Sequence, residues 1–215
     1  MKKEKPHKRD ASATRQRILD AARTVFAEHG LTGARVDQIA RASEANVQMI
    51  YRYFGSKEEL YMAALADTYV RIREVERKLD LSSLSPLDGV RRLIEFTFDY
   101  LDDNPEFVAI IRNENGAGGQ YVKQLPMVSD STQSLIETID DLICRGRESG
   151  EFRREIDARH LYVSILSLCI GHQAQRCTLS VMLRTDLGSK PVSYTHLRAH
   201  ETYLLISYAV FCLKM

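Results

Sequence analysis

The 215-residue sequence has no long hydrophobic run. Its longest apolar stretch, YLLISYAVFCL at residues 203–213, has 11 residues, whereas a helix that spans a bilayer needs roughly 20. The first ten residues, MKKEKPHKRD, are charged and lack the apolar core of a secretory signal. We therefore expect no transmembrane segment, no secretory signal and no membrane partner.

Cysteine is also scarce. The four cysteines, Cys144, Cys169, Cys177 and Cys212, do not show the paired spacing of a zinc site. Free thiols in a reducing cytoplasm are the simplest interpretation. Cys169 and His172 lie i, i+3 on one predicted helix, but no second ligand cluster accompanies them, which favours core packing or a dimer interface. We expect no metal and no cofactor.

The short motifs that mark many enzymes are absent too. The sequence contains no nucleophile elbow, no phosphate-binding glycine loop and no metal-ligand motif. Carboxylates such as Asp102 and Asp103 fall at a predicted helix end, where solvation is the simpler role. These absences argue against an enzyme.

Helical periodicity is what the sequence does contain. Hydrophobic residues make up 44% and charged residues 27%, which is typical of a folded globular protein. No stretch alternates with period two for long enough to predict a sheet. Apolar repeats and capping residues predict helices at 14–29, 36–42, 47–54, 57–79, 86–100, 106–113, 130–149 and 157–183. The fold is therefore predicted to be all-α.

Charge is concentrated at the N-terminal end. The net charge is only +1, yet residues 1–57 carry 12 Lys and Arg against 6 Asp and Glu. A local basic excess favours nucleic acid or another anionic surface, although charged runs are often only solvated. For the basic tail at residues 1–11 two interpretations stay open, a solvated segment and an arm that enters the minor groove.

Three short predicted helices within about 45 residues, the last two joined by a tight turn, are typical of a helix-turn-helix DNA-binding motif. Asn46 is a favoured N-cap for the third helix. Ser56 and Glu59 form the S-x-x-E pattern that starts the next one. Ile50 and Phe54, spaced i, i+4, are predicted to face the core.

The other side of this third helix offers side chains that suit DNA. Val47, Gln48, Tyr51 and Arg52 are predicted to face outward, with Tyr53 partly so. Gln and Arg can hydrogen-bond to base edges, and tyrosine hydroxyls suit phosphates. Lys57 lies beside the free amides at the next helix start, where phosphates bind. In isolation, so many aromatic residues would suggest ordinary packing; their place in the motif favours DNA recognition.

The segment ILDAARTVFAEHGLTGARVDQIARASEANVQMIYRYFGSKEEL, residues 18–60, resembles the DNA-binding region of the TetR/AcrR family of bacterial transcriptional regulators. The resemblance covers the apolar pattern of the first helix, the IA of the second, IYRYF in the third and SKEEL after it. It implies operator contacts from Arg35, Asn46, Val47, Gln48, Met49, Tyr51, Arg52, Tyr53 and Lys57.

Two positions depart from the family pattern. Ala34 and Arg35 stand where the family usually has a Thr or Ser phosphate contact, and the charge of Arg35 is expected to supply that contact. Glu44 stands where members tend to have Gly, so it strains a turn that needs positive φ and places a negative charge near phosphate. This departure keeps open an alternative function, a protein-binding adaptor that has lost DNA binding.

Residues 61–190 resemble the ligand-binding and dimerisation region of the family in helix number and length. The resemblance implies a ligand-responsive repressor that acts as a homodimer on a pseudo-palindromic operator in double-stranded DNA. It also implies a cavity for a small-molecule effector of unknown identity, and a coupling role for the helix at 57–79.

Several residues of this region are candidates for lining the effector pocket. They are Phe96, Tyr100, Phe107, Arg112, His172, Gln173 and Arg176. Core packing remains open for the aromatic residues, and interface or surface positions for the polar ones at 172–176. Arg112, which is followed by Asn113 and Asn115, is of special interest because an arginine beside a cavity can bind an anionic effector.

The last segment, residues 191–215, has a different character. It contains one acidic residue, Glu201, and no clear amphipathic stripe, although the family places its final dimerisation helix here. The segment is either non-native or a divergent last helix at residues 203–212. We therefore expect a basic tail at 1–11, a DNA-binding domain at 12–60, a ligand-binding and dimerisation domain at 61–190, and an atypical tail at 191–215.

Overall fold

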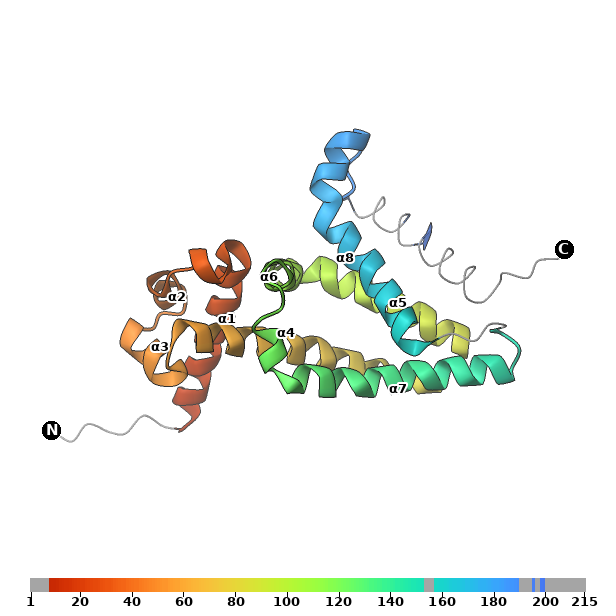
Figure 1. The fold of residues 1–215 in the computed structure, drawn as a ribbon, viewed down its shortest axis with the longest axis horizontal. Helices are drawn as coiled ribbons and strands as arrows, with labels where there is room; N and C mark the ends of the chain where they lie inside the picture. Colours follow the sequence, from red (N-terminus) through yellow and green to blue (C-terminus); the bar gives the residue numbers. More distant parts are fainter. Residues whose placement is uncertain (1–7, 153–156, 190–194, 196–197, 200–215) are drawn as a thin grey trace. The chain divides into compact units, whose positions relative to one another are not determined.

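The computed structural model describes residues 8–152, 157–189, 195 and 198–199 (Figure 1). Every regular element among them is helical, which confirms the predicted fold class. The longer helices are α1 (Lys8–Gly33), α2 (Val36–Ala42), α3 (Val47–Phe54), α4 (Lys57–Glu76), α5 (Pro86–Asp103), α6 (Pro105–Gly116), α7 (Pro126–Glu148) and α8 (Ala158–Leu183). Short 3-10 turns are η1 (Arg77–Leu79), η2 (Leu81–Ser83) and η3 (Val122–Gln124).

The helices form two compact units. The first comprises Met1–Arg71 and Ala109–Ser129, and the second comprises Ile72–Val108 and Asp130–Met215. Helices α4, α6 and α7 each contribute residues to both units. Within the described part of the chain, no helix combines the length and apolar character that crossing a bilayer requires.

The predicted helix bounds agree closely in some places and differ in others. α2 and α3 have the bounds expected from the sequence. α1 begins before residue 14 and continues past Gly30, whose φ of 64° nevertheless interrupts the helix where its end was predicted. α7 begins at Pro126 rather than at residue 130, because proline suits the first turn of a helix. The predictions for residues 1–7 and 203–212 concern positions outside the described residues.

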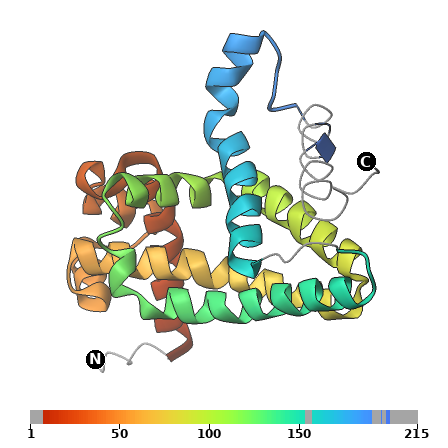
Figure 2. The same cartoon turned by 45° about the vertical axis from the view of Figure 1, so that its right-hand side comes forward.

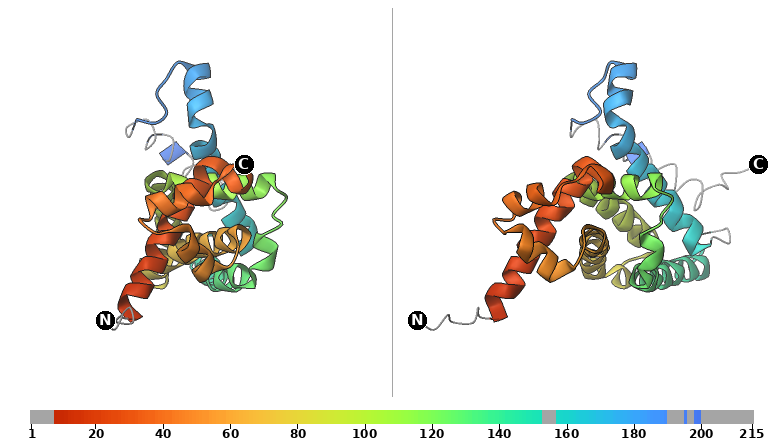
Figure 3. Two further views of the ribbon diagram at one scale, coloured as in Figure 1. Left: turned by 90° about the vertical axis from the view of Figure 1, so that its left-hand side faces the viewer. Right: turned by 60° about the vertical axis from the view of Figure 1, so that its left-hand side comes forward.

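The core of the first unit is formed by apolar faces of α1 to α4, and Figure 3 shows the first three of these helices, coloured red to orange, in one group. Phe26, Ile39 and Ile50 are fully buried or nearly so. α2 and α3 have seven and eight residues, too few to be stable alone, so this shared burial holds them.

An ion-pair network joins α1 to α4 in the same unit. Arg23 Nη1 lies 2.6 Å from Asp67 Oδ2 and 3.2 Å from Asp20 Oδ1. Arg71 contacts both carboxylates, at 2.6 Å from Asp20 and 2.7 Å from Asp67. Because four charges share these contacts and Arg23 and Asp67 are largely buried, the network holds α4 to α1 more firmly than an isolated surface pair.

The first unit also includes the end of α6 and the connection that follows it. Glu114 is 3% exposed and accepts a 3.0 Å hydrogen bond from the Tyr61 hydroxyl. Its other carboxylate oxygen accepts bonds from the backbone N–H groups of Tyr121 and Val122, at 2.8 and 2.9 Å. Burial, and then the charge of Glu114, raise the pKa of Tyr61. Glu114 thereby joins α4 to the connection that leads into α7.

Asn113 makes a second connection to α1. Its side-chain N–H donates to the carbonyls of Phe26 and Ala27, at 3.1 and 3.2 Å, in the turn before the interruption at Gly30. Helix interruptions leave carbonyls without their usual intrahelical donors, so a side-chain amide is well placed there.

The second unit is built on the packing of α5 against α8, which Figure 2 shows crossing each other. Leu93 and Leu101 of α5 and Ile165 of α8 are all buried. α7 approaches α5 closely at Gly89, where an added Cβ would lie 2.5 Å from the Leu142 side chain. The small residue is therefore required by packing.

We expect Glu114→Ala to destabilise the protein by about 2 kcal/mol or more, since it leaves the Tyr61 hydroxyl and two backbone N–H groups without their acceptor. Glu114→Gln keeps an oxygen for the two amides and should retain most of the stability. Urea unfolding followed by circular dichroism measures both. Equal midpoints for wild type and Glu114→Ala would show that the network contributes nothing.

Candidate nucleic-acid interface and effector cavity

α3 presents the side chains that were predicted to face outward. Ile50 and Phe54 are 1% and 8% exposed. On the opposite side Val47, Gln48, Tyr51 and Arg52 are exposed, and Met49 and Tyr53 are half-buried. The orientation of the helix is therefore confirmed. Contact of these residues with DNA stays a prediction.

Capping residues fix both ends of this helix. The Asn46 side-chain oxygen accepts a 2.7 Å bond from the Met49 N–H, so the predicted N-cap is present. At the other end Gly55 has a φ of 80°, and an added Cβ would lie 2.1 Å from the Glu59 carboxylate. The Ser56 hydroxyl then accepts from the Glu59 N–H at 3.0 Å and starts α4. α3 thus begins and ends at defined residues.

Two of the predicted DNA contacts, Arg35 and Lys57, are cationic residues outside α3. Arg35, the N-cap residue of α2, has a side chain that is 73% exposed and lies 3.1 Å from Asp37. The pKa of Asp37 is lowered. Desolvation acts to raise this pKa, but the hydrogen bond and charge of Arg35, together with the charge of Arg41, outweigh it. Lys57 donates a long, 3.5 Å bond to the Thr32 carbonyl, which leaves two ammonium hydrogens for phosphate.

The turn between α2 and α3 contains Glu44 in the left-handed region, with a φ of 53°. The Ala45 N–H donates to the Ala40 carbonyl at 3.0 Å and closes the turn around this residue. The expectation that the turn needs positive φ is confirmed. A residue with a Cβ adopts this conformation at a cost that glycine avoids, and the exposed side chain adds a negative charge beside α3.

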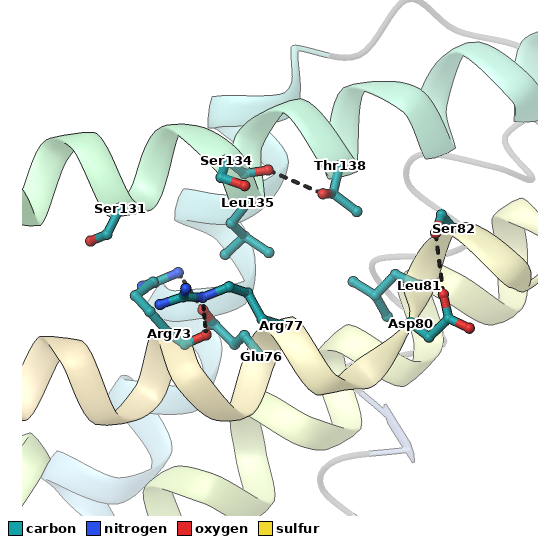
Figure 4. A pocket seen from close by; sticks show the side chains of 10 residues that line it. All are labelled: Arg73, Glu76, Arg77, Asp80, Leu81, Ser82, Ser131, Ser134, Leu135 and Thr138. Atoms are coloured by element: carbon teal, nitrogen blue, oxygen red, sulfur yellow. Dashed lines mark hydrogen bonds and ion pairs between the residues drawn. The ribbon is translucent and has the colours of Figure 1, made fainter.

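The second unit contains a cavity of about 180 Å³ (Figure 4). Its walls come from the end of α4, the η1 and η2 turns with Asp80 between them, and α7. The lining residues are Arg73, Glu76, Arg77, Asp80, Leu81, Ser82, Ser131, Ser134, Leu135 and Thr138. The Arg73 and Glu76 side chains are only 5% and 3% exposed. A buried ion pair thus lies at one wall of the cavity.

Arg73 uses only part of its hydrogen-bonding capacity. Its Nη2 donates to the Tyr162 hydroxyl at 2.5 Å, and Nη1 lies 2.5 Å from Glu76 Oε2. The second contact is close but poorly directed, so Arg73 Nε and Nη1 and both Glu76 oxygens make no hydrogen bond with any described residue. Burial raises the pKa of Glu76 to about 7, although the charge of Arg73 opposes this shift.

Comparisons with known proteins agree with the DNA-binding geometry. The family model described as "Bacterial regulatory proteins, tetR family" matches residues 18–64, and the one described as "Tetracyclin repressor-like, C-terminal domain" matches residues 86–202. The chain belongs to the TetR family. Its DNA-binding match contains α2, α3 and the start of α4.

Two curated TetR-family relatives are similar over most of their length. The HTH-type transcriptional repressor NicS of Pseudomonas putida is 37% identical over 180 residues, which cover 84% of this chain and 85% of NicS. The repressor SCO4008 of Streptomyces coelicolor is 37% identical over 163 residues, covering 74% of this chain and 78% of the relative.

Solved structures support the fold. The putative transcriptional regulator SCO4942 of Streptomyces coelicolor has a TM-score of 0.68 and is 22% identical in sequence. The match covers 91% of this chain and 98% of the SCO4942 chain. FadR of Bacillus subtilis, solved in complex with stearoyl-CoA, has a TM-score of 0.62 and is 19% identical in sequence. The match covers 87% of this chain and 97% of the FadR chain.

The predicted pocket residues make contacts away from the cavity. Phe96, Tyr100 and Phe107 form an aromatic row, with ring centroids 5.7 and 6.0 Å apart. The side chains of Gln173 and Arg176 both donate to Asp102 Oδ1, at 3.0 and 3.1 Å.

His172 is buried, with its ring centroid 5.2 Å from that of Phe98. None of the predicted pocket residues lines the 180 Å³ cavity or the hollow of about 540 Å³ in the first unit. Arg112 is exposed, which corrects the expectation that it lies beside a buried cavity.

Arg73, Glu76 and Tyr162 were missed by sequence reasoning. Tyr162 is 89 residues from Arg73, so no local pattern links them. A weak signal did exist, because the buried stripe of α4 at Leu65, Thr68 and Ile72 continues at position 76 with a glutamate. A carboxylate at a buried helical position marks a site that needs a partner.

Glu44→Gly should raise both stability and DNA affinity. The free energy of unfolding should rise by about 0.5–1 kcal/mol. This is the gain from relieving the left-handed conformation, minus the cost of the greater entropy that glycine gives the unfolded chain. Glu44→Gln removes the charge but keeps the strain, so it should raise DNA affinity alone. Thermal unfolding and duplex titration of both variants separate the two effects. If the Glu44→Gly protein has a lower melting temperature than wild type, Glu44 is not strained in the folded protein.

Glu76 should make stability fall as pH rises. Its pKa of about 7 in the folded protein exceeds the ordinary 4.5, so the folded state keeps a proton that the unfolded state loses between these pH values. The penalty at pH 7 is on the order of 3 kcal/mol. Glu76→Gln should therefore gain stability relative to wild type from pH 4.5 to 7, measured by urea unfolding. Glu74→Gln, an exposed change on the same helix, is the control. If the free energy of unfolding varies with pH in the same way for wild type and Glu76→Gln, the pKa of Glu76 is not raised.

Proposed function

We propose that the chain is a ligand-responsive transcriptional repressor that binds a pseudo-palindromic DNA operator as a homodimer. The carrying observation is the capped α3 helix, which exposes Gln48, Tyr51 and Arg52 within the TetR DNA-binding match. The repressors NicS and SCO4008, each 37% identical to this chain, support repression as the outcome.

In this proposal α3 enters the major groove. Gln48 and Arg52 read base edges, because their amide and guanidinium groups match the donor and acceptor pattern there. Arg35, Tyr51 and Lys57 contact phosphates, with help from Asn46, Val47, Met49 and Tyr53 along the same surface. A two-fold dimer places two α3 helices in grooves one helical turn, about 34 Å, or a multiple of it apart.

The first unit is built to move with α4. Arg23, Asp67 and Arg71 hold α4 to α1, and Glu114 holds it to the connection before α7. Any displacement of α4 therefore carries the DNA-reading helices with it. An effector lowers operator affinity if it binds the DNA-incompetent arrangement more tightly than the competent one.

Exposed apolar residues on α8 support the homodimer. Val163, Val181, Met182 and Leu183 are 57%, 79%, 74% and 61% exposed. Apolar residues this exposed on one helix are typical of a surface that another protein covers, and two-fold self-association is the commonest arrangement.

A second candidate function, a protein-binding adaptor that has lost DNA binding, is favoured by Glu44 alone. Its strained backbone and negative charge both lie at the edge of the DNA-reading surface. An absence of any selected operator would favour the adaptor.

Selection of bound duplexes from a random library tests the proposal. Wild type should enrich a palindrome. Arg52→Ala should lose preference at one base position by about 1–3 kcal/mol, whereas Lys57→Ala should weaken binding to all sequences and lower the salt slope by about 1. Arg92→Ala, an exposed change on α5, is the control. Identical base preferences for wild type and Arg52→Ala would rule out base reading by this arginine.

A further inference from the structure

The cavity of the second unit holds polar groups that are almost completely buried and incompletely bonded. Arg73 and Glu76 are buried over their whole length, backbone included. Two guanidinium nitrogens and both carboxylate oxygens lack hydrogen bonds among the described residues. Figure 4 shows both side chains rising from α4 toward Ser134 and Leu135 of α7. Buried polar groups in native proteins are normally satisfied. These four atoms are closed off from the cavity by the contact between the two side chains, so a ligand supplies their partners only by moving Arg73 and Glu76 apart.

The volume limits the size of that ligand. The cavity measures about 180 Å³. A dry cavity of about 150 Å³ in another protein holds benzene, so this one admits roughly one six-membered ring with a small substituent. Leu81 and Leu135 provide apolar walls for such a ring. A long acyl chain does not fit.

The charges that line the cavity favour a single negative charge on the ligand. Arg73 and Arg77 are cationic, Glu76 and Asp80 are acidic, and the Tyr162 hydroxyl bonds to Arg73 from α8. α7 contributes the hydroxyls of Ser131, Ser134 and Thr138 and no charged group. When Glu76 carries a proton, the lining has a net charge of +1, which one carboxylate neutralises.

We propose that this cavity is the effector site and that the effector is a monocarboxylate of about one ring in size, bound between Arg73 and Glu76 with uptake of one proton. The regulatory part of this inference rests on the proposed repressor function. The binding part rests on the cavity alone.

The proton balance follows from the placement of the groups. The incoming carboxylate accepts hydrogen bonds from Arg73, and its charge disfavours an ionised Glu76 beside it. Glu76 therefore takes a proton from solvent, and its O–H donates to the bound carboxylate. Below pH 7 Glu76 is already protonated and affinity does not change; above pH 7 affinity falls up to tenfold per pH unit.

Calorimetric titration of the full chain without DNA tests the binding. Benzoate, cyclohexanecarboxylate and propionate are the probes, with benzamide as the uncharged match and dodecanoate as the long-chain match. A one-ring carboxylate should bind at least tenfold more tightly than benzamide and dodecanoate, and more tightly than propionate. Titrations from pH 6 to 8.5 in buffers of different ionisation enthalpy should show uptake of one proton well above pH 7 and little uptake at pH 6.

Variants then assign the binding to the two residues. Glu76→Gln should bind the carboxylate with no pH dependence from 6 to 8.5, because its amide donates a hydrogen bond at every pH. Arg73→Met combined with Glu76→Gln, which leaves no buried charge unpaired, should lose affinity at least tenfold. Arg91→Met is the matched control, since Arg91 pairs with Asp88 at the same i, i+3 spacing on an exposed surface.

The inference is overturned if no monocarboxylate binds, if benzamide binds as well as benzoate, or if the double variant retains wild-type affinity. The failure of the repressor function has a different signature. If benzoate binds as described and no operator is selected, the site stands and repression fails. If an operator is bound with equal affinity with and without the carboxylate, DNA binding stands and the effector role is refuted.

Discussion

The buried hydrogen bond between Tyr61 and Glu114 is the contact on which the first unit depends. Tyr61 belongs to α4, and its ring packs edge-on against Phe26 of α1 and against Tyr121, with centroids 5.1 and 5.2 Å apart. A phenol placed there without an acceptor would leave a polar group in an apolar core. Glu114 provides that acceptor and also binds two backbone amides, so one carboxylate fixes α4 and a distant chain segment together. The orientation of α3 depends on this core, because Ile50 and Phe54 pack into the same unit.

Much of the DNA-reading surface follows from local sequence. Ile50 and Phe54 at i, i+4 decide which side of α3 is buried, and Asn46 and Gly55 decide where the helix begins and ends. The buried side and the ends of α3 therefore require only the geometry of neighbouring residues. The positive φ at Glu44 was expected from the family resemblance instead, because members tend to have Gly at this position.

The cavity and the packing of α6 were not predictable in the same way. Glu114 contacts a residue 53 positions away, and Arg73 contacts Tyr162 from 89 positions away. A helical pattern shows that such a residue lies on a buried or exposed side, but not which partner it meets. The same limit explains Arg112, whose charge suggested a binding role although it lies on the exposed side of α6. The first unit also includes Ala109–Ser129, which no composition change in the sequence marks.

The Arg73–Glu76 pair is best explained by function, because burial of a charged pair is a poor way to stabilise a helical core. Apolar residues of similar volume in place of such pairs are often neutral or stabilising. Here the unfavourable burial is greater than usual, since the 2.5 Å contact is poorly directed and the pKa of Glu76 is raised to about 7. A pair with only a structural role would gain from tighter hydrogen bonds, yet Arg73 Nε and Nη1 and both Glu76 oxygens make none with any described residue. The two residues instead lie at the wall of a space large enough for a small ring, where a carboxylate bound between their side chains would satisfy Arg73 and, with one proton, Glu76.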